Sequence, residues 1–189
     1  MEDLKSVADE IRGCTLCDLC LKRKNAVPGE GSERAGLLII GEAPGKNEDL
    51  QGRPFVGMSG RFLTKYLEEA GLKRGDVFIT NAVKCRPPEN RKPKREEIDK
   101  CRPYLIRQLS LIRPKLILAL GTSAASSLGI GFSHLSEIKS RVLDITLDGR
   151  TFKCLVTFHP SFPMRFPRAR KGFMDDILAA KKAYKNLPT

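Results

Sequence analysis

Short apolar runs alternate with longer amphipathic stretches along most of the chain. The runs at residues 37–40, 77–80 and 116–120 are almost wholly apolar, which predicts strands buried on both faces. The stretches between them carry apolar residues at helical spacing, and glycines such as Gly13 and Gly71 end two of them. Helices are therefore predicted over residues 4–13, 61–70, 94–111, 122–128 and 173–185.

A hairpin is predicted in the C-terminal part of the chain. Two strand-like segments, residues 141–147 and 151–158, flank the pair Asp148-Gly149. An Asp-Gly pair between two strands is typical of a type I′ turn. The second arm of this hairpin leads directly into His159.

The order of these elements predicts the fold class. Strands that alternate with helices favour an α/β fold, and we expect a three-layer α/β/α sandwich with a central, mainly parallel four-stranded sheet. Right-handed crossovers then bring the loops that follow Ile40, Thr80, Leu120 and Phe158 to one edge of the sheet. The chain shows no repeat, low-complexity tract or linker, so residues 1–189 are predicted to form a single domain.

The segment that follows the first strand, residues 41–60, is rich in glycine and carboxylates. It holds five glycines and two prolines together with Glu42, Glu48 and Asp49. Glycine lets a ligand approach the backbone closely, and ligands of α/β proteins bind where parallel strands end. With Phe55 as its one aromatic residue, this segment predicts a pocket for a flat polar ring.

The composition points to a polyanionic partner. The 189 residues carry a formal net charge of +12, and the sequence pI is about 9.6. Basic residues gather in two tracts, 86–100 and 165–171, which favours nucleic acid binding over a merely solubilising surface. No apolar run approaches the roughly 18 residues of a membrane span, and no signal-peptide pattern is present. A cytoplasmic, nucleoid-associated protein without membrane contact is therefore expected.

Six cysteines in a chain of this kind favour a metal site over disulfides. Cys14 and Cys17 form a CxxC pair, and Cys85 and Cys101 are separated by fifteen residues. Four thiolates drawn from two segments can bind zinc or an iron–sulfur cluster, and spacing alone does not decide between them. Cys154 lies in an apolar strand and is expected to be a core residue.

Four motifs resemble those of a known enzyme family. Residues 41–45 read Gly-Glu-Ala-Pro-Gly, and with the Glu-Asp and Pro-Phe-Val-Gly that follow they resemble the first motif of the uracil-DNA glycosylase superfamily, in particular its iron–sulfur-containing family 4. The likeness extends from the CxxC at residues 14–17 through Thr-Asn-Ala-Val-Lys-Cys-Arg-Pro-Pro at 80–88 to His-Pro-Ser at 159–161. The resemblance implies a base excision repair enzyme that flips uracil out of single- or double-stranded DNA, hydrolyses its N-glycosidic bond and leaves an abasic site.

The resemblance also implies a four-iron four-sulfur cluster held by Cys14, Cys17, Cys85 and Cys101. Such a cluster is expected to be structural and to tie the N-terminal segment to the basic loop, since uracil excision requires no electrons. Cys20 completes a second CxxC with Cys17 and is expected to be a bystander or a substitute ligand.

Three residues in the segments that follow predicted strands are expected to hold the extruded base. Phe55 would stack on the ring, with an ordinary core phenylalanine as the alternative. Asn81 would pair with the O4 and N3–H edge of uracil and reject cytosine, whose polarity is reversed, with a turn-capping asparagine as the alternative. His159 would donate a hydrogen bond to O2 as charge builds on the leaving group. His134 has no motif around it and is given no role.

Two carboxylates complete the expected pocket. Glu42 is the candidate for holding or activating water. Ala43 stands where several superfamily members have an aspartate, which weakens any claim for a strong general base. Most of the acceleration is therefore expected from stabilising the leaving group and the cationic sugar. Glu48 is expected to close the pocket near C5 and exclude the methyl group of thymine, with a surface acid as the alternative.

Further contacts are expected from the loops around the pocket. The backbone amides of Gly41, Gly45 and Gly57 are candidates for uracil or phosphate contacts. The expected DNA-binding side chains are Ser59, Lys84, Thr122, Ser123, Ser161, Arg165, Arg168 and Arg170. One apolar residue of the segment 161–171 is expected to fill the gap left by the flipped base, and the sequence does not say which.

A monomer is expected, and the sequence leaves contact with a replication clamp open. The competing functional class is an iron–sulfur electron carrier, or a cluster-bearing nucleic-acid-binding module without catalysis. Only the enzyme would create alkali-labile sites in a uracil-containing oligonucleotide.

Overall fold

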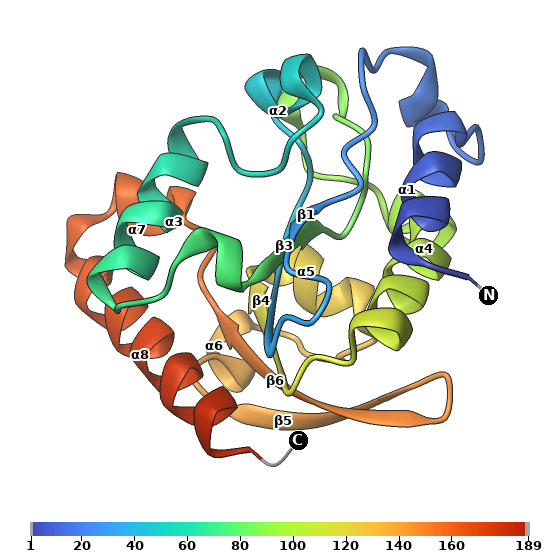
Figure 1. Ribbon diagram of the computed structural model, residues 1–189. Helices are drawn as coiled ribbons and strands as arrows, with labels where there is room; N and C mark the ends of the chain where they lie inside the picture. Colours follow the sequence, from blue (N-terminus) through green and yellow to red (C-terminus); the bar gives the residue numbers. More distant parts are fainter. Residues whose placement is uncertain (1, 188–189) are drawn as a thin grey trace.

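The protein is built on one six-stranded sheet, described for residues 2–187 in a computed structural model (Figure 1). In chain order the strands are β1 (Glu30–Gly31), β2 (Leu37–Gly41), β3 (Phe78–Asn81), β4 (Leu116–Leu120), β5 (Val142–Leu147) and β6 (Arg150–Thr157). They lie in the order β1-β3-β2-β4-β6-β5. The four inner strands are parallel, as predicted, and the count rises to six because β1 and β5 add antiparallel edges.

Helices cover both faces of this sheet, which confirms the predicted three layers (Figure 1). One layer contains α1 (Leu4–Gly13), α4 (Arg95–Ile112), α5 (Thr122–Ser127) and α6 (Leu135–Ile138). The other contains α3 (Met58–Glu69), α7 (Ser161–Arg165) and α8 (Arg170–Asn186). Because both faces are covered, every residue of β2 and β4 is buried, and these strands read as continuous apolar runs.

Alternate residues of the central strands pack into two separate hydrophobic cores, one on each face of the sheet. Leu38 and Ile40 of β2 pack in one cluster with Leu105 and Leu109 of α4. The intervening Leu37 and Ile39 pack in a second cluster with residues of α3 and α8. The period of two along a strand thus fixes both helical layers on the sheet.

The predicted hairpin is present between β5 and β6. Asp148 and Gly149 have φ of +49° and +72°, the positive values that a type I′ turn requires. Leu147 and Arg150 form the strand pair next to the turn. Residue 159, directly past this hairpin, is thereby delivered to the carboxyl-terminal edge of the sheet.

Several helices were missed or shortened in the prediction. The segment 41–60 contains a helix, α2 (Lys46–Gln51), and α3 begins at Met58 rather than Arg61, because Gly45 and Gly57 serve as their N-caps. The basic segment after His159, predicted as a loop, forms α7 and the start of α8. Short 3₁₀ turns complete the chain: η1 (Asp18–Leu21), η2 (Arg74–Asp76), η3 (Pro88–Asn90) and η4 (Pro167–Ala169).

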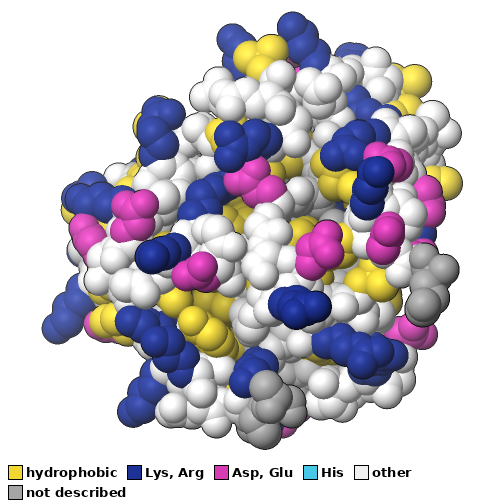
Figure 2. All heavy atoms as spheres, in the orientation of Figure 1, with side chains coloured by type: hydrophobic (Ala, Val, Ile, Leu, Met, Phe, Trp, Pro, Cys, Tyr) yellow, Lys and Arg dark blue, Asp and Glu magenta, His cyan; other side chains and the backbone are white. Residues whose placement is uncertain are grey.

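The surface is basic on the face that Figure 2 shows. Lys and Arg side chains are scattered across that face, with Asp, Glu and uncharged groups between them, in line with the net charge of +12. Within residues 2–187, none of the helices has both the length and the apolar composition that crossing a membrane would need.

Candidate active site

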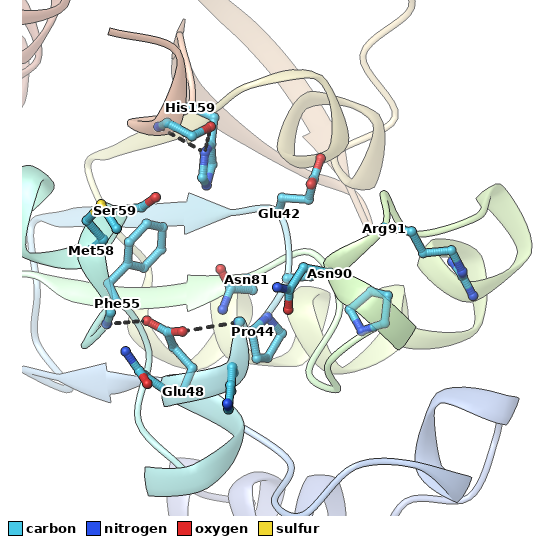
Figure 3. Close-up of a pocket in the computed structure, with 17 residues that line it drawn as sticks. Glu42, Pro44, Glu48, Phe55, Met58, Ser59, Asn81, Asn90, Arg91 and His159 are labelled. Atoms are coloured by element: carbon cyan, nitrogen blue, oxygen red, sulfur yellow. Dashed lines mark hydrogen bonds between the residues drawn. The ribbon is translucent and has the colours of Figure 1, made fainter. Parts of the chain in front are cut away.

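A cavity of about 360 Å³ lies where β2, β3 and β6 end (Figure 3). Its wall includes Phe55, Asn81 and His159, which are far apart in the sequence, together with Glu42 and Glu48. The predicted convergence of these five residues at one edge of the sheet is therefore found, because right-handed connections between parallel strands put the strand ends on the same side. Their chemical roles stay predictions.

The Phe55 ring forms one side of the cavity. Its centroid lies 6.1 Å from that of the His159 ring, and the two ring planes differ by 34°. Gly41 makes room for it, since a Cβ at position 41 would lie 2.4 Å from both the Phe55 ring and Asn81 Oδ1. Phe55 itself has φ of +51°, in the left-handed region that residues with side chains seldom adopt.

Asn81 is the last residue of β3 and is 2% exposed. Its Oδ1 is buried, and no group of the described residues donates a hydrogen bond to it. The alternative of a turn-capping asparagine is therefore wrong, because a cap would pair this oxygen with a backbone amide. An unpaired buried acceptor costs about 1–3 kcal/mol, so it marks a place where a ligand that donates a hydrogen bond would be stabilised.

His159 is held by the residue two positions on. The Ser161 backbone N–H donates to Nδ1 over 3.3 Å, and the Ser161 hydroxyl lies 2.8 Å from the same nitrogen. Since Nδ1 accepts, the proton of the neutral ring is on Nε2, on the side of the ring that faces the cavity (Figure 3). Burial lowers the pKa of His159, although the nearby charges of Glu42 and Glu48 oppose this. The ring is thus a neutral donor.

Glu42 follows β2 and is oriented by a residue of α5. The Ser123 hydroxyl donates to Glu42 Oε2 over 2.6 Å, and Ser123 is 1% exposed. The prediction that Ser123 contacts DNA is wrong, because its hydroxyl is buried and committed to this carboxylate. The Glu42 side chain is thereby kept in the cavity wall.

Glu48, in α2, organises the loop rather than facing solvent. It is 9% exposed, and Oε1 accepts hydrogen bonds from the Val56 and Gly57 amides over 2.8 and 2.6 Å. Oε2 accepts from the Gly45 amide over 3.1 Å. The alternative of a surface acid is therefore wrong, and the Gly45 and Gly57 amides already have a partner within the protein.

Five cysteines line a second, smaller cavity between α1, α4 and the loop after β3. They are Cys14, Cys17, Cys20, Cys85 and Cys101. The four thiols that the resemblance selects are thus brought together from both ends of the fold, and Cys20 lies with them. Cys154 is fully buried in β6, as expected of a core residue.

Protein groups around these sulfurs suit thiolates. Arg23 donates to Cys85 Sγ over 3.0 Å, and the Lys84 backbone N–H donates to Cys101 Sγ over 3.3 Å. Burial raises the pKa of the Cys85 thiol, and that of Cys101 to about 12, so a thiolate here needs a cation beside it. Within residues 2–187, no three His, Cys, Asp or Glu side chains converge as ligands of a single ion. Four thiols from two segments are a donor set that zinc or an iron–sulfur cluster can use.

Comparison with known proteins decides the family. The family model described as the uracil DNA glycosylase superfamily matches residues 28–182. The chain belongs to that superfamily. A type-4 uracil-DNA glycosylase of Pyrobaculum aerophilum is 45% identical over 93% of this chain and 91% of its own length. Type-4 enzymes of Archaeoglobus fulgidus (43% identical; 94% and 91% covered) and Thermotoga maritima (40% identical; 97% and 96% covered) are similarly related.

One predicted DNA contact of this superfamily member is wrong. Lys84 is 1% exposed, and its ammonium donates inside the protein to Thr80 Oγ1, the Asn81 carbonyl and Gln108 Oε1 over 2.6–2.9 Å. Burial lowers the pKa of Lys84 to about 8, against the charges of Cys101 and Cys85. The lysine therefore supports the end of β3, just behind Asn81, and does not reach DNA.

The other predicted DNA contacts of the superfamily member lie at the surface. Arg165, Arg168 and Arg170 are exposed on α7, η4 and the start of α8. Ser161 is exposed and Ser59 and Thr122 are partly exposed at the first turns of α7, α3 and α5. These positions are open to a ligand, and the contacts themselves stay predictions.

Sequence reasoning missed part of the pocket wall of this superfamily member. Asn47, Met58, Pro87, Asn90 and Arg91 also line the cavity. The last three belong to the proline-rich basic tract, whose composition signalled DNA binding but not proximity to the base. Asn90 has φ of +56°, a left-handed turn conformation that asparagine adopts more readily than most residues. An asparagine in this tract was therefore a local sequence signal for a turn.

Proposed function

We propose that this superfamily member excises uracil from single- or double-stranded DNA in base excision repair, by hydrolysing the N-glycosidic bond. The observation that carries the proposal is the unpaired, buried Asn81 Oδ1 in a cavity bounded by the Phe55 and His159 rings. A base inside a duplex cannot reach such a site, so the nucleotide must be flipped out. The type-4 uracil-DNA glycosylases to which the chain is similar support the same activity.

Asn81 would read the edge of the base. Uracil has a donor at N3 and an acceptor at O4, which match the Asn81 oxygen and amide nitrogen. Cytosine has an acceptor at N3 and an amino donor at C4, so its binding would leave Asn81 Oδ1 unpaired and oppose like groups. Phe55 would stack on the same ring, and Glu48 would limit the space beside C5.

His159 would stabilise the departing base. As the bond from the sugar to uracil N1 breaks, its electron pair moves onto the ring and charge builds on O2. A neutral Nε2–H aimed at that oxygen stabilises the anion without a proton having to be transferred. The Ser161 contacts to Nδ1 keep the ring in this tautomer.

Glu42 would hold the water that completes the reaction. The carboxylate, oriented by Ser123, accepts a hydrogen bond from water and directs its oxygen to the cationic sugar carbon. Ala43 supplies no second acid. Most of the rate enhancement would therefore come from stabilising the anionic base and the sugar cation.

The basic segment after His159 would bind the DNA backbone. Arg165, Arg168 and Arg170 are exposed there and are suited to phosphates, as are the hydroxyls of Ser59, Thr122 and Ser161. Phe162 is 41% exposed one residue past Ser161, which makes it our candidate to fill the gap left by the flipped base.

We also propose that Cys14, Cys17, Cys85 and Cys101 hold a four-iron four-sulfur cluster, with Cys20 as the spare thiol. Bound there, it supplies a rigid link between residues 14–17 and 85–101 and no electron to the reaction. Arg23 and the Lys84 amide, which contact two of the sulfurs, would share the negative charge of the thiolates.

The proposed enzyme is one domain, residues 1–189, acting as a monomer. A single cavity contained in one chain needs no second copy to complete it. DNA is its substrate partner, and in cells without a nucleus that DNA is in the cytoplasm.

A glycosylase assay tests the proposal. Single- and double-stranded oligonucleotides with one uracil are incubated with iron-loaded protein, treated with alkali and checked for cleavage at the uracil. Matched oligonucleotides with thymine or cytosine at that position should stay intact. Binding of the uracil oligonucleotide without any alkali-labile site, over a range of temperatures, would instead indicate a binding module and refute the enzyme.

A further inference from the structure

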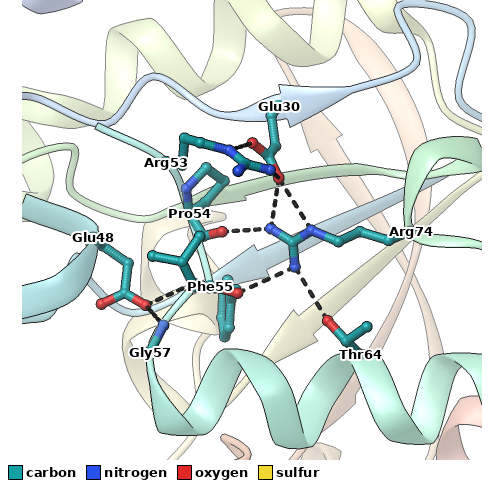
Figure 4. Close-up of polar contacts among 9 residues, drawn as sticks. Glu30, Glu48, Arg53, Pro54, Phe55, Gly57, Thr64 and Arg74 are labelled. Atoms are coloured by element: carbon teal, nitrogen blue, oxygen red, sulfur yellow. Dashed lines mark hydrogen bonds and ion pairs between the residues drawn. The ribbon is translucent and has the colours of Figure 1, made fainter. Parts of the chain in front are cut away.

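The backbone around Phe55 is held from two sides by opposite charges (Figure 4). Glu48 accepts hydrogen bonds from the amides of Val56 and Gly57. On the other side, Arg74 donates to the carbonyls of Pro54 and Phe55, the latter over 3.2 Å. An anion on the amides and a cation on the carbonyls leave this stretch little freedom to rotate.

Phe55 needs such support because of its backbone conformation. A φ of +51° is strained for a residue with a side chain, so the surroundings must impose it. Helix α3 contributes by close approach, since a Cβ on Gly60 would lie 2.0 Å from the Phe55 carbonyl carbon and oxygen. A change of φ at Phe55 would turn its Cα–Cβ bond, and the ring would turn with it.

Arg74 is itself fixed by a carboxylate and a hydroxyl. Its Nε and Nη2 donate to Glu30 Oε1 over 3.0 and 2.7 Å, and Nη1 donates to Thr64 Oγ1 over 3.4 Å. With the two loop carbonyls, the guanidinium makes five hydrogen bonds, one for each N–H that it carries. A lysine ammonium has three donors at one point and does not span these acceptors.

Glu30 connects this network to the edge strand β1. Burial would raise the pKa of Glu30, but hydrogen bonds from Arg53 and Arg74 outweigh it and the pKa lies below its ordinary value. The Glu30 side chain is 26% exposed and that of Arg74 is 21% exposed, whereas Arg53 is 59% exposed. Arg53 binds Glu30 over 2.8 Å from outside, and Figure 4 draws no contact from its side chain to the loop carbonyls.

We propose that Arg74, anchored by Glu30, is a positioning residue that sets the Phe55 ring for stacking on the base. It touches neither the base nor the sugar and acts only through the carbonyls of residues 54 and 55. This inference rests on the proposed function, because it assumes that Phe55 stacks on uracil.

The test compares Arg74→Met with Arg53→Met, which removes the other arginine on Glu30. Because stacking on an aromatic side chain contributes to base binding, Arg74→Met should raise KM and the inhibition constant of free uracil about tenfold. The kcat should change by less than about threefold, because stacking stabilises bound substrate and transition state alike. Arg53→Met should change each quantity by less than about twofold.

A double-mutant cycle separates positioning from general support. In a Phe55→Ala background the ring is absent, so adding Arg74→Met should change KM by less than about twofold. Thermal unfolding of each variant shows that it is folded. If Arg74→Met does not fold, Arg74→Lys takes its place in both backgrounds, with a smaller rise in KM expected.

The results distinguish the two claims. Wild-type protein that excises no uracil refutes the proposed function. An active wild type with Arg74→Met equal to Arg53→Met refutes the positioning role. So does an effect of Arg74→Met that persists in full without the Phe55 ring.

Discussion

The base pocket and the cysteine cavity share the loop after β3, yet different forces give them their shapes. The pocket encloses about 360 Å³, and its side chains are fixed by other protein groups: Ser123 on Glu42, Ser161 on His159, and Glu48 and Arg74 on the Phe55 loop. The cysteine cavity encloses about 10 Å³, room for about one water molecule, and is walled by sulfur and apolar carbon.

The base pocket is therefore a preformed site, whereas the shape of the cysteine cavity depends on the group that it would bind. We expect the pocket to receive a base without changing, because protein groups already fix the side chains of its wall. The cysteine cavity would be held together by the proposed cluster, because its thiols come from two separate segments. Its N-terminal wall is partly open to solvent, with Leu16 54% and Leu21 77% exposed. We therefore expect metal to order the N-terminal segment and to leave the pocket unaltered.

The largest effect should come from removing two sulfurs. The double change Cys85→Ser with Cys101→Ser should abolish the brown colour and the bound iron and sulfide, and should lower the free energy of unfolding by more than about 3 kcal/mol, because metal binding is coupled to folding. Iron content, visible absorbance and thermal melting measure this. Cys20→Ser is the matched control and should retain iron; equal loss of iron in the control would contradict the assigned ligands.

The pocket is tested by His159→Ala and Asn81→Ala. Loss of a preorganised donor to a developing anion costs about 10²–10³ in rate, so His159→Ala should lower kcat by that factor with little change in KM. Asn81→Ala should mainly weaken uracil binding, by about tenfold, because it removes two neutral hydrogen bonds. Single-turnover rates and uracil inhibition separate the two. Wild-type behaviour of both variants would refute their roles.

The strands were predicted from local pattern, whereas the pocket residues Phe55, Asn81 and His159 were chosen largely by the resemblance to uracil-DNA glycosylases. Runs such as β4 were placed to the residue, and the parallel order then required the strand ends to meet. Lys84 and Ser123 were misplaced because their partners are distant: Gln108 is 24 residues from Lys84, and Glu42 is 81 residues from Ser123. Arg74 carried no signal at all, since its acceptors belong to four residues that lie 10 to 44 positions away in the sequence. A single sequence shows which groups are polar but not which distant acceptor they will meet.

Lys84 connects the two regions, because its ammonium donates to the Asn81 carbonyl and its backbone N–H donates to Cys101 Sγ. Lys84→Met leaves the acceptors at Thr80, Asn81 and Gln108 without their donor, so it should lower the free energy of unfolding by about 1–3 kcal/mol. The salt dependence of DNA binding should not change, because the lysine is buried. Arg168→Gln is the counterpart and should lower the salt slope by about 1 without altering the melting temperature. A weaker salt dependence of DNA binding for Lys84→Met would instead show that Lys84 does contact DNA.

The smallest expected effect is a shift of the pH at which His159 in the pocket becomes protonated. His159 has a lowered pKa, so its ring should stay neutral below the ordinary value of about 6.5, and kcat should not fall until the pH is lower than that. Between the lowered pKa of the folded protein and the ordinary value of the unfolded chain, the unfolded chain binds more protons than the folded one. The free energy of unfolding should therefore rise with pH across this window, and this stability should be lost as the pH falls through it. The chain has two histidines, so an NMR titration with His134→Asn as control assigns the pKa of His159 directly. A pKa at or above 6.5 would mean that the charges of Glu42 and Glu48 outweigh burial, and His159 would then favour leaving-group departure as a cation instead of a neutral donor.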